Sequence, residues 1–182
     1  GDMAASAAIS ANVLRRIIKE VTSDTEPLGL SKAAEELGGP SKAWWSVETG
    51  LSGAGYQSFS VEIEGPEEYE TVEKDGAPRE SPYKGAWFKF QLTFGPSYPH
   101  DPPKVALLTP TYHTHVDTDQ LSMCATLVPE TWATLAIERR SIFELLKILR
   151  GFLATPSGDH AVNADASRIF QENIDEFDRL AR

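Results

Sequence analysis

The chain contains one cysteine, Cys124, and its thiol is the side chain best suited to covalent chemistry. A lone thiol cannot form an internal disulfide, so Cys124 could serve as buried packing, as a metal ligand or as a nucleophile. The polar segment Asp117 to Ser122 precedes it, and a loop interrupted by Pro129 follows it. Segments of this composition lie at protein surfaces, which favours a thiol at an exposed edge of the fold.

Two histidines upstream of the thiol, His113 and His115, could join Cys124 as metal ligands. A structural zinc site usually takes four ligands, and the sequence supplies neither a second cysteine nor a matched pair. We therefore expect no metal site, and no cofactor. A cysteine hydrolase is a further alternative, and it would need one of these histidines within about 3 Å of the sulfur together with an oxyanion pocket.

Hydrophobic periodicity indicates the elements that position this thiol. Apolar residues recur every three or four positions from Ser6 to about Thr22 and from Ile142 to Leu153, which predicts two amphipathic helices. A weaker stripe from about Asn163 to the end predicts a helix that bends or breaks near Asn173. Strands are predicted in three runs, Ser58 to Glu64, Trp87 to Phe94 and Lys104 to Thr109. This order predicts an α+β domain with an N-terminal helix, an antiparallel meander sheet of about four strands, a cysteine loop and C-terminal helices.

Two segments are predicted to lack long regular elements. Ser23 to Gly55 is rich in glycine and proline, so we expect an irregular insertion with at most a short helix over Ser31 to Leu37. Acidic residues concentrate between Glu62 and Glu80, which is typical of a solvated acidic loop. We expect one domain over residues 6–182, preceded by a tag remnant or disordered start at 1–5.

Charge and cysteine content limit the partners. The chain has 27 acidic and 17 basic residues, for a net charge of -10, which repels nucleic acid. It shows no secretory signal and no apolar run long enough to span a membrane. A single cysteine fits a reducing compartment, so we expect a soluble protein of the cytoplasm, the nucleus or both.

A proline-rich segment, Tyr98 to Pro103, is expected to form a stiff, non-helical arch, because proline fixes its own φ and keeps the preceding residue extended. Further motifs lie before and after this segment: Ser81-Pro82-Tyr83-Lys84-Gly85, Phe88, Tyr98-Pro99-x-x-Pro102-Pro103-Lys104-Val105, Tyr112-His113, Cys124 and Trp132. In their order and approximate spacing these motifs resemble a ubiquitin-conjugating enzyme, and the match covers most of the chain from Gly65 to Arg182. The helix before Thr22 is similar to the first helix of the family.

This resemblance implies a UBC-like fold and a covalent carrier. The cysteine of the family accepts the C-terminal glycine of ubiquitin, or of a ubiquitin-like modifier, from an activating enzyme as a thioester. An amine of a protein substrate, usually a lysine, then attacks the thioester, often with a ligase holding both parties. An ordinary cysteine, with a pKa of about 8.5, supplies a few per cent thiolate at neutral pH, which suffices when the acyl donor is already an activated thioester.

The motif before the thiol departs from the family. Where the family usually reads His-Pro-Asn, this chain reads His113-Thr114-His115. The asparagine of the family donates a hydrogen bond that stabilises an oxyanion or braces the loop. His115 could replace this donor through an imidazole N–H, or it could be a merely structural or exposed histidine, whereas His113 is expected to brace the loop. Tyr112 and Trp132 are expected to be structural residues beside the site.

Other candidate residues lie farther from the thiol. Asp159 lies next to the position of a family acid that orients the incoming lysine, although an aspartate here could instead cap a helix. His100 and Arg139 occupy places where the family contacts its ligases, so we expect familiar ligases to bind weakly or not at all. On the first helix, three basic residues could contact an acidic partner or simply keep the outer face solvated: Arg15, Arg16 and Lys19.

The sequence supports one main hypothesis and one alternative. The main hypothesis is an active but non-standard ubiquitin-conjugating enzyme that carries its modifier on Cys124. The alternative is a catalytically inactive variant that binds ubiquitin or another partner without forming a thioester. The retained cysteine favours the first, and the altered His113-Thr114-His115 motif favours the second.

Overall fold

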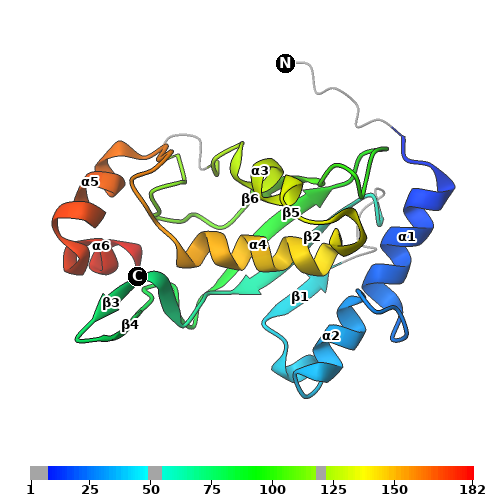
Figure 1. Cartoon of the computed structure of the whole chain (residues 1–182), viewed down its shortest axis with the longest axis horizontal. Helices are drawn as coiled ribbons and strands as arrows, with labels where there is room; N and C mark the ends of the chain where they lie inside the picture. The colour runs from blue at the N-terminus through cyan, green and yellow to red at the C-terminus, as the bar shows by residue number, and fades with distance from the viewer. Residues whose placement is uncertain (1–7, 49–54, 118–121) are drawn as a thin grey trace.

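The computed structural model describes residues 8–48, 55–117 and 122–182, and the expected tag remnant at 1–5 lies outside them. Figure 1 shows an elongated α+β fold with α1 and α2 at one end and α5, α6 and a hairpin at the other. The helices are α1 (Ala11–Thr22), α2 (Leu30–Glu36), α3 (Leu127–Ala133), α4 (Ile142–Ala154), α5 (Ala164–Glu172) and α6 (Ile174–Ala181). The strands are β1 (Trp45–Glu48), β2 (Ser58–Glu64), β3 (Glu68–Lys74), β4 (Ala77–Glu80), β5 (Trp87–Thr93) and β6 (Lys104–Leu107).

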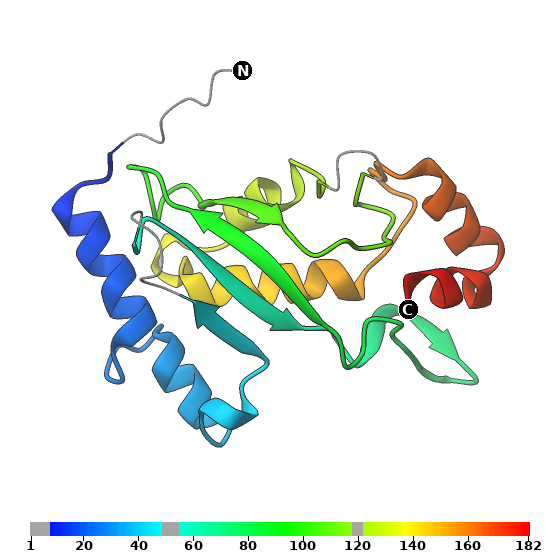
Figure 2. The ribbon, with the colours of Figure 1, turned by 180° about the vertical axis from the view of Figure 1, so that it is seen from behind.

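The central sheet is antiparallel, with the strand order β1-β2-β5-β6. The predicted alternation is confirmed in β2, where Phe59, Val61 and Ile63 are buried and Glu62 is exposed. α4 packs across one face of the central sheet. Figure 2, which shows the molecule from the opposite side to Figure 1, has the strands of this sheet in front of α4. The apolar residues of α4 are almost completely buried. Burial of each leucine among them contributes about 1.5–3 kcal/mol to stability.

β1, a strand of the central sheet that the three predicted runs did not include, lies within the segment that we predicted to be irregular. β1 pairs with β2 so that Trp45 is opposite Ile63, and Trp45 is buried. The prediction of an irregular insertion over Ser23 to Gly55 was therefore wrong for this part, because the strand is stabilised by a neighbour distant in sequence. The short helix predicted over Ser31 to Leu37 is present as α2.

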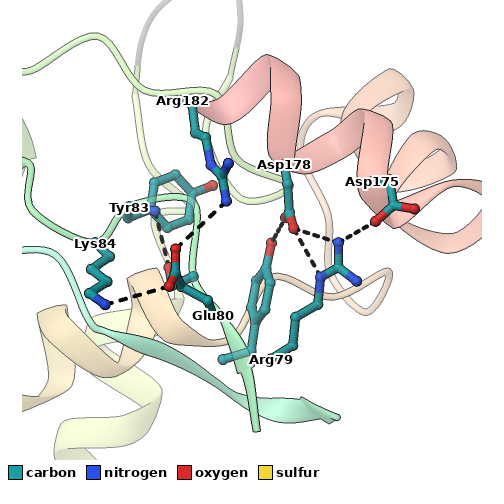
Figure 3. Close-up of polar contacts among 9 residues, drawn as sticks. Arg79, Glu80, Tyr83, Lys84, Asp175, Asp178 and Arg182 are labelled. Atoms are coloured by element: carbon teal, nitrogen blue, oxygen red, sulfur yellow. Dashed lines mark hydrogen bonds and ion pairs between the residues drawn. The ribbon is translucent and has the colours of Figure 1, made fainter. Parts of the chain in front are cut away.

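The acidic segment before residue 80 is a hairpin and not the predicted loop. β3 and β4 pair across a turn in which Asp75 and Gly76 both have positive φ, at 55° and 78°, the pattern of a type I′ turn. The hairpin packs on α6 through a buried carboxylate, Asp178, which accepts hydrogen bonds from Tyr69 Oη and from Arg79 Nε at 2.9 Å (Figure 3). The acids from Glu67 to Glu80 are exposed, as composition predicted, but they belong to a hairpin that a salt bridge to the last helix fixes.

The remaining helices follow the prediction with one exception. α5 and α6 are separated at Asn173, whose φ of -153° is not helical, so the predicted break is confirmed. α3 forms where a proline-broken loop was expected, because Pro129 lies in its first turn and needs no N–H donor there. In the described part of the chain, no helix is long and apolar enough to cross a membrane.

Candidate active site

Cys124 is half-buried and lies at a cleft of about 520 Å³. One wall of the cleft is the end of the proline-rich arch with the start of β6, and includes Pro102, Pro103 and Lys104. The other wall comes from the cysteine loop and α3, and includes Met123 and Val128. The thiol is therefore placed at a groove in the surface, as its sequence neighbourhood predicted.

Backbone pairing fixes the thiol relative to the His113-Thr114-His115 motif. The Cys124 N–H donates to the His115 carbonyl at 2.8 Å, and Val116 forms an antiparallel bridge with Met123. The hydroxyl of Thr126 lies 3.4 Å from the Cys124 sulfur. Although Thr126 precedes α3, its side chain does not cap that helix, so its hydroxyl is free to interact with the sulfur.

His113 is a buried brace. Its Nε2 lies 3.0 Å from the Phe152 carbonyl, and its Nδ1 accepts from the His115 N–H at 3.0 Å. Burial, assisted by neighbouring His115, lowers the pKa of His113 to about 3. The imidazole is therefore neutral, donates from Nε2 to the end of α4, and holds the loop as predicted for a bracing residue.

The side chain of His115 contacts the connection between α4 and α5. Its Nδ1 lies 3.3 Å from the His160 carbonyl, and its Nε2 lies 3.3 Å from the Ser157 hydroxyl. Burial is the main cause that lowers the pKa of His115. Thr114 reinforces the contact, since its hydroxyl accepts from the Ser157 N–H at 3.0 Å. Donation by His115 to an oxyanion stays a prediction, because both ring nitrogens are already engaged in this structure.

Asp159 is exposed on the same connection, beside the Ser157 and His160 atoms that contact His115. It does not cap α5, because Asn163 does so by accepting from the Ala166 N–H at 3.0 Å. The His113-Thr114-His115 motif thus holds the loop that carries Asp159. An orienting role for this carboxylate stays a prediction.

Trp132 and Tyr112, which sequence analysis placed beside the site, contact the arch and α6 respectively. The buried indole of Trp132 donates from Nε1 to the carbonyls of Pro99 at 3.1 Å and His100 at 3.2 Å. Tyr112 packs its ring 5.4 Å from Phe177, and its carbonyl accepts from another tyrosine hydroxyl at 2.6 Å. Both are structural residues in these contacts, in agreement with the expectation.

Besides Asp178, sequence analysis missed a second buried acid, Glu20. Its carboxylate accepts from Tyr98 Oη of the arch at 2.6 Å and from the Ile142 N–H, which starts α4, at 2.8 Å. Burial raises the pKa of Glu20, and these two hydrogen bonds lower it. The effect of burial is the larger, so the pKa is raised. A signal was present, because Glu20 follows Ile17 by three positions and so lies on the apolar face of α1.

The predicted partner contacts have different environments. All three basic residues of α1 line a groove of about 670 Å³. Arg15 and Lys19 are exposed, whereas Arg16 is half-buried and donates to Glu20 at 3.3 Å and to the carbonyl of residue 140 at 2.9 Å. His100 is exposed within the arch, and Arg139 is exposed in the connection between α3 and α4.

The contacts of the histidine rings bear on the hydrolase and metal alternatives. Within the ranges that the structure describes, the ring contacts of His113 and His115 are with atoms other than the Cys124 sulfur. The same part of the chain contains no group of three or more histidine, cysteine or acidic residues arranged to hold a metal ion.

Comparisons with known proteins agree with this geometry. A family model described as "Ubiquitin-conjugating enzyme" matches residues 47–182. Among relatives, "Ubiquitin-conjugating enzyme E2 3" of Arabidopsis thaliana is 29% identical over 102 residues, which are 56% of this chain and 65% of that protein. "Ubiquitin-conjugating enzyme E2 S" of Dictyostelium discoideum is 28% identical over 105 residues, or 58% of this chain and 46% of that protein. The chain thus matches less than two thirds of the length of either relative.

Solved structures show the same fold. A "Novel Ubiquitin-Conjugating Enzyme" superposes with a TM-score of 0.62 at 18% identity, covering 94% of this chain and 91% of that one. The E2 domain of a Toxoplasma gondii ubiquitin conjugating enzyme gives a TM-score of 0.63 at 20% identity, covering 92% of each chain. With the UBC-like fold shown and the family model matching residues 47–182, the chain belongs to the ubiquitin-conjugating enzyme family.

Proposed function

We propose that this protein is a thioester carrier for ubiquitin or a ubiquitin-like modifier. Cys124 accepts the modifier from an activating enzyme and passes it to an amine, usually a lysine, of a protein substrate, typically with a ligase. The observation that supports this most directly is the half-buried thiol at the open cleft of about 520 Å³. A nucleophilic thiol needs access for an acyl donor on one side and for an amine on the other, and a surface cleft provides both.

The chemistry assigns a balanced sequence of steps. The Cys124 thiolate attacks the thioester carbonyl of the modifier on the activating enzyme, a new C–S bond forms, the old C–S bond breaks, and the cysteine of the activating enzyme leaves as a thiolate. In the second step a neutral amine attacks the same carbonyl, a C–N bond forms and the C–S bond breaks. Cys124 leaves as a thiolate, and the amine proton passes to water. His113 holds the loop, and His115 with Ser157 and Thr114 holds the segment that carries Asp159.

A charging assay tests the proposal. The protein is incubated with activating enzymes, ATP and a panel of ubiquitin-like modifiers, and adducts are resolved with and without reducing agent. We expect an adduct that reducing agent removes, that is lost in Cys124→Ala, and that becomes resistant to reducing agent as an oxyester in Cys124→Ser. If no modifier gives such an adduct, the carrier mechanism is wrong.

The same assay tests the alternative, a non-catalytic module that binds ubiquitin or a partner. This alternative is favoured by one observation, that both ring nitrogens of His115 are engaged by the Ser157 hydroxyl and the His160 carbonyl. A binding module would retain affinity for ubiquitin or a partner in a pull-down and would form no thioester. A carrier forms the thioester whether or not free ubiquitin binds.

A further inference from the structure

A groove of about 830 Å³ lies between the β3–β4 hairpin and α4, and we call it the hairpin groove. Among the described residues, none that lines it also lines the Cys124 cleft. Part of its surface is apolar, formed by Trp44, Pro66, Pro78 and Ala154. The rest is charged, with acidic residues from the hairpin side and basic residues from α4. Surfaces that bind other proteins combine apolar area with a polar rim in this way.

Three exposed glutamates line the hairpin side of the groove: Glu67, Glu68 and Glu70. Across the part of the chain that the structure describes, their carboxylates form no ion pair and accept no hydrogen bond. Other exposed acids do have partners, as Glu80 has in Lys84. The hairpin side of the groove therefore carries negative charge that is left for solvent or a bound partner to contact.

The basic residues on the α4 side are already engaged within the fold. Lys147 Nζ lies 2.7 Å from Glu144 Oε1. Arg150 donates to the Glu64 carbonyl at 3.2 Å, and its guanidinium carbon lies 4.9 Å from the centroid of the Trp44 ring. These contacts use both cations, so the groove favours a partner that brings positive charge of its own.

The strand geometry of β3 sets the spacing of two of the glutamates. Glu68 and Glu70 are exposed, whereas Tyr69 between them is buried and donates to Asp178. Because successive side chains of a strand point to opposite faces, the two glutamates share one face, with about 6.8 Å between their Cα atoms. An extended peptide has the same repeat, so residues two positions apart in such a peptide can meet both carboxylates.

We propose that the hairpin groove docks an extended segment of a partner protein in which lysine or arginine residues stand two positions apart. Their charged ends face Glu68 and Glu70, and their aliphatic stems cover the apolar lining. Charge complementarity selects this occupant, because acidic side chains repel nucleic acid and anionic lipid. Residues 1–7, 49–54 and 118–121 contain no lysine or arginine, so these segments of the chain cannot supply the cations. Docking needs no thioester, so the inference goes beyond the proposed function and is tested without it.

Gly151 leaves room on the α4 side of the groove. A Cβ at this position would meet Glu70 Oε1 at 4.0 Å, which is an ordinary contact. Methionine and alanine are better helix formers than glycine, so neither should destabilise α4. Gly151→Met places a long side chain in the groove and thus obstructs it without changing any charge, whereas Gly151→Ala is the small control.

Fluorescence anisotropy with a labelled peptide tests the docking on the full chain without any modifier. The probe peptide has three lysines separated by single threonines, and its isomer has three lysines separated by pairs of threonines. In an extended peptide the first spacing puts all the lysines on one side, and the second alternates them. We expect the probe to bind at least threefold more tightly than the isomer, and to weaken at least tenfold when sodium chloride rises from about 50 mM to about 300 mM. Failure of the probe to bind, or equal affinity for the two peptides, overturns the proposal.

Charge variants locate the binding site of the probe. Glu68→Gln/Glu70→Gln removes two charges from the groove, and Glu35→Gln/Glu36→Gln removes two charges from exposed acids of α2. We expect the Kd of the probe to rise at least tenfold in the first variant and less than twofold in the second. Equal losses in the two variants would show that the peptide responds only to net charge, and would overturn the proposal.

The variants of Gly151 test the groove independently of charge. We expect Gly151→Met to raise the Kd of the probe at least fivefold and Gly151→Ala to leave it within twofold, with both variants as stable to urea as the wild type. Wild-type binding by Gly151→Met would show that the peptide lies elsewhere, and would overturn the proposal.

Sedimentation velocity separates a partner segment from a second copy of the chain as the occupant. We expect the wild-type chain to be a monomer at micromolar concentration. A dimer that Glu68→Gln/Glu70→Gln dissociates would show that a second copy fills the groove, and would overturn the proposal.

Discussion

Tyr98 Oη donates a hydrogen bond of 2.6 Å to Glu20 Oε2, and both side chains are buried. The same carboxylate accepts from the Ile142 N–H at 2.8 Å. One acid therefore joins α1, the proline-rich arch and the start of α4. The arch forms a wall of the Cys124 cleft, so Glu20 positions the cleft without contacting it.

Replacing this acid should destabilise the fold. Glu20→Ala leaves the Tyr98 hydroxyl and the Ile142 N–H buried without their partner, which should lower the free energy of unfolding by about 2–4 kcal/mol. Urea denaturation followed by circular dichroism measures the change. Glu36→Ala, an exposed acid on α2, is the control and should change stability by less than about 0.5 kcal/mol. Equal stability of the two variants would show that the Glu20 contacts are not important.

The stability contributed by His113 should depend on pH. Burial lowers the pKa of His113 to about 3, below its value of about 6.5 in an unfolded chain. Between these values the unfolded state binds a proton that the folded state does not, so stability falls as pH falls, by about 1.4 kcal/mol per pH unit. The difference in unfolding free energy between wild type and His113→Gln should shrink with this slope from pH 6 to pH 4. It should stay constant from pH 7.5 to pH 9, and a flat difference over the acidic range would contradict the assignment.

Thr126 should support the reactive form of the thiol. Its hydroxyl, 3.4 Å from the Cys124 sulfur, can donate a hydrogen bond to the thiolate. Loss of one such bond, worth about 0.6–1.4 kcal/mol, corresponds to a three- to tenfold lower rate of alkylation by iodoacetamide at pH 7. We expect this decrease in Thr126→Val and wild-type rates in Thr126→Ser, which retains the hydroxyl. Similar rates in all three proteins would show that the hydroxyl does not act on the sulfur.

His115 should affect the release of the modifier more than its acceptance. In the charging assay, His115→Ala should slow discharge to a free amine about tenfold or more, with a smaller effect on thioester formation. Ser157→Ala removes the hydroxyl that contacts Nε2 and separates two explanations. If Ser157→Ala also slows discharge, His115 acts by holding the loop of Asp159. If discharge is slow only in His115→Ala, the imidazole acts on the oxyanion, and equal effects of His115→Ala on both steps would contradict the prediction.

The hairpin should depend on its contact with the last helix. Arg79 donates to buried Asp178 at 2.9 Å, so Arg79→Ala leaves a buried carboxylate with Tyr69 as its remaining partner. We expect a loss of about 2 kcal/mol in the free energy of unfolding. Arg168→Ala, which removes an exposed ion pair within α5, is the control and should cost less than about 0.5 kcal/mol. A similar small cost for Arg79→Ala would show that the hairpin is held by apolar packing alone.

Local patterns explain which parts of the fold were predictable. The apolar stripe of α4 and the alternation in β2 are properties of neighbouring residues, and both elements formed where the sequence placed them. The break at Asn173 was visible for the same reason. Features stabilised by distant contacts were not visible. β1 depends on pairing with β2, and the acidic hairpin depends on Asp178, about a hundred positions later in the chain.

The candidate site shows the same division. Cys124 and its surface position could be inferred from composition and neighbours, and the bracing role of His113 followed from the resemblance. The contact of His115 with Ser157 joins segments that are 42 positions apart, so no local pattern predicts it. Glu20 was missed because its partners, Tyr98 and Ile142, lie 78 and 122 positions away in the chain, although its place on the apolar face of α1 suggested a buried partner.

α4 is attached at both of its ends. Near its start, the Ile142 N–H is held by Glu20, and near its finish the Phe152 carbonyl is held by His113. The ten-residue interval between these anchors spans about 15 Å of helix. The length of α4 thus sets the distance between the arch and the loop that carries His113, and hence the width of the cleft at Cys124. Adding one residue inside α4 would lengthen this separation by about 1.5 Å and rotate one anchor by about 100°.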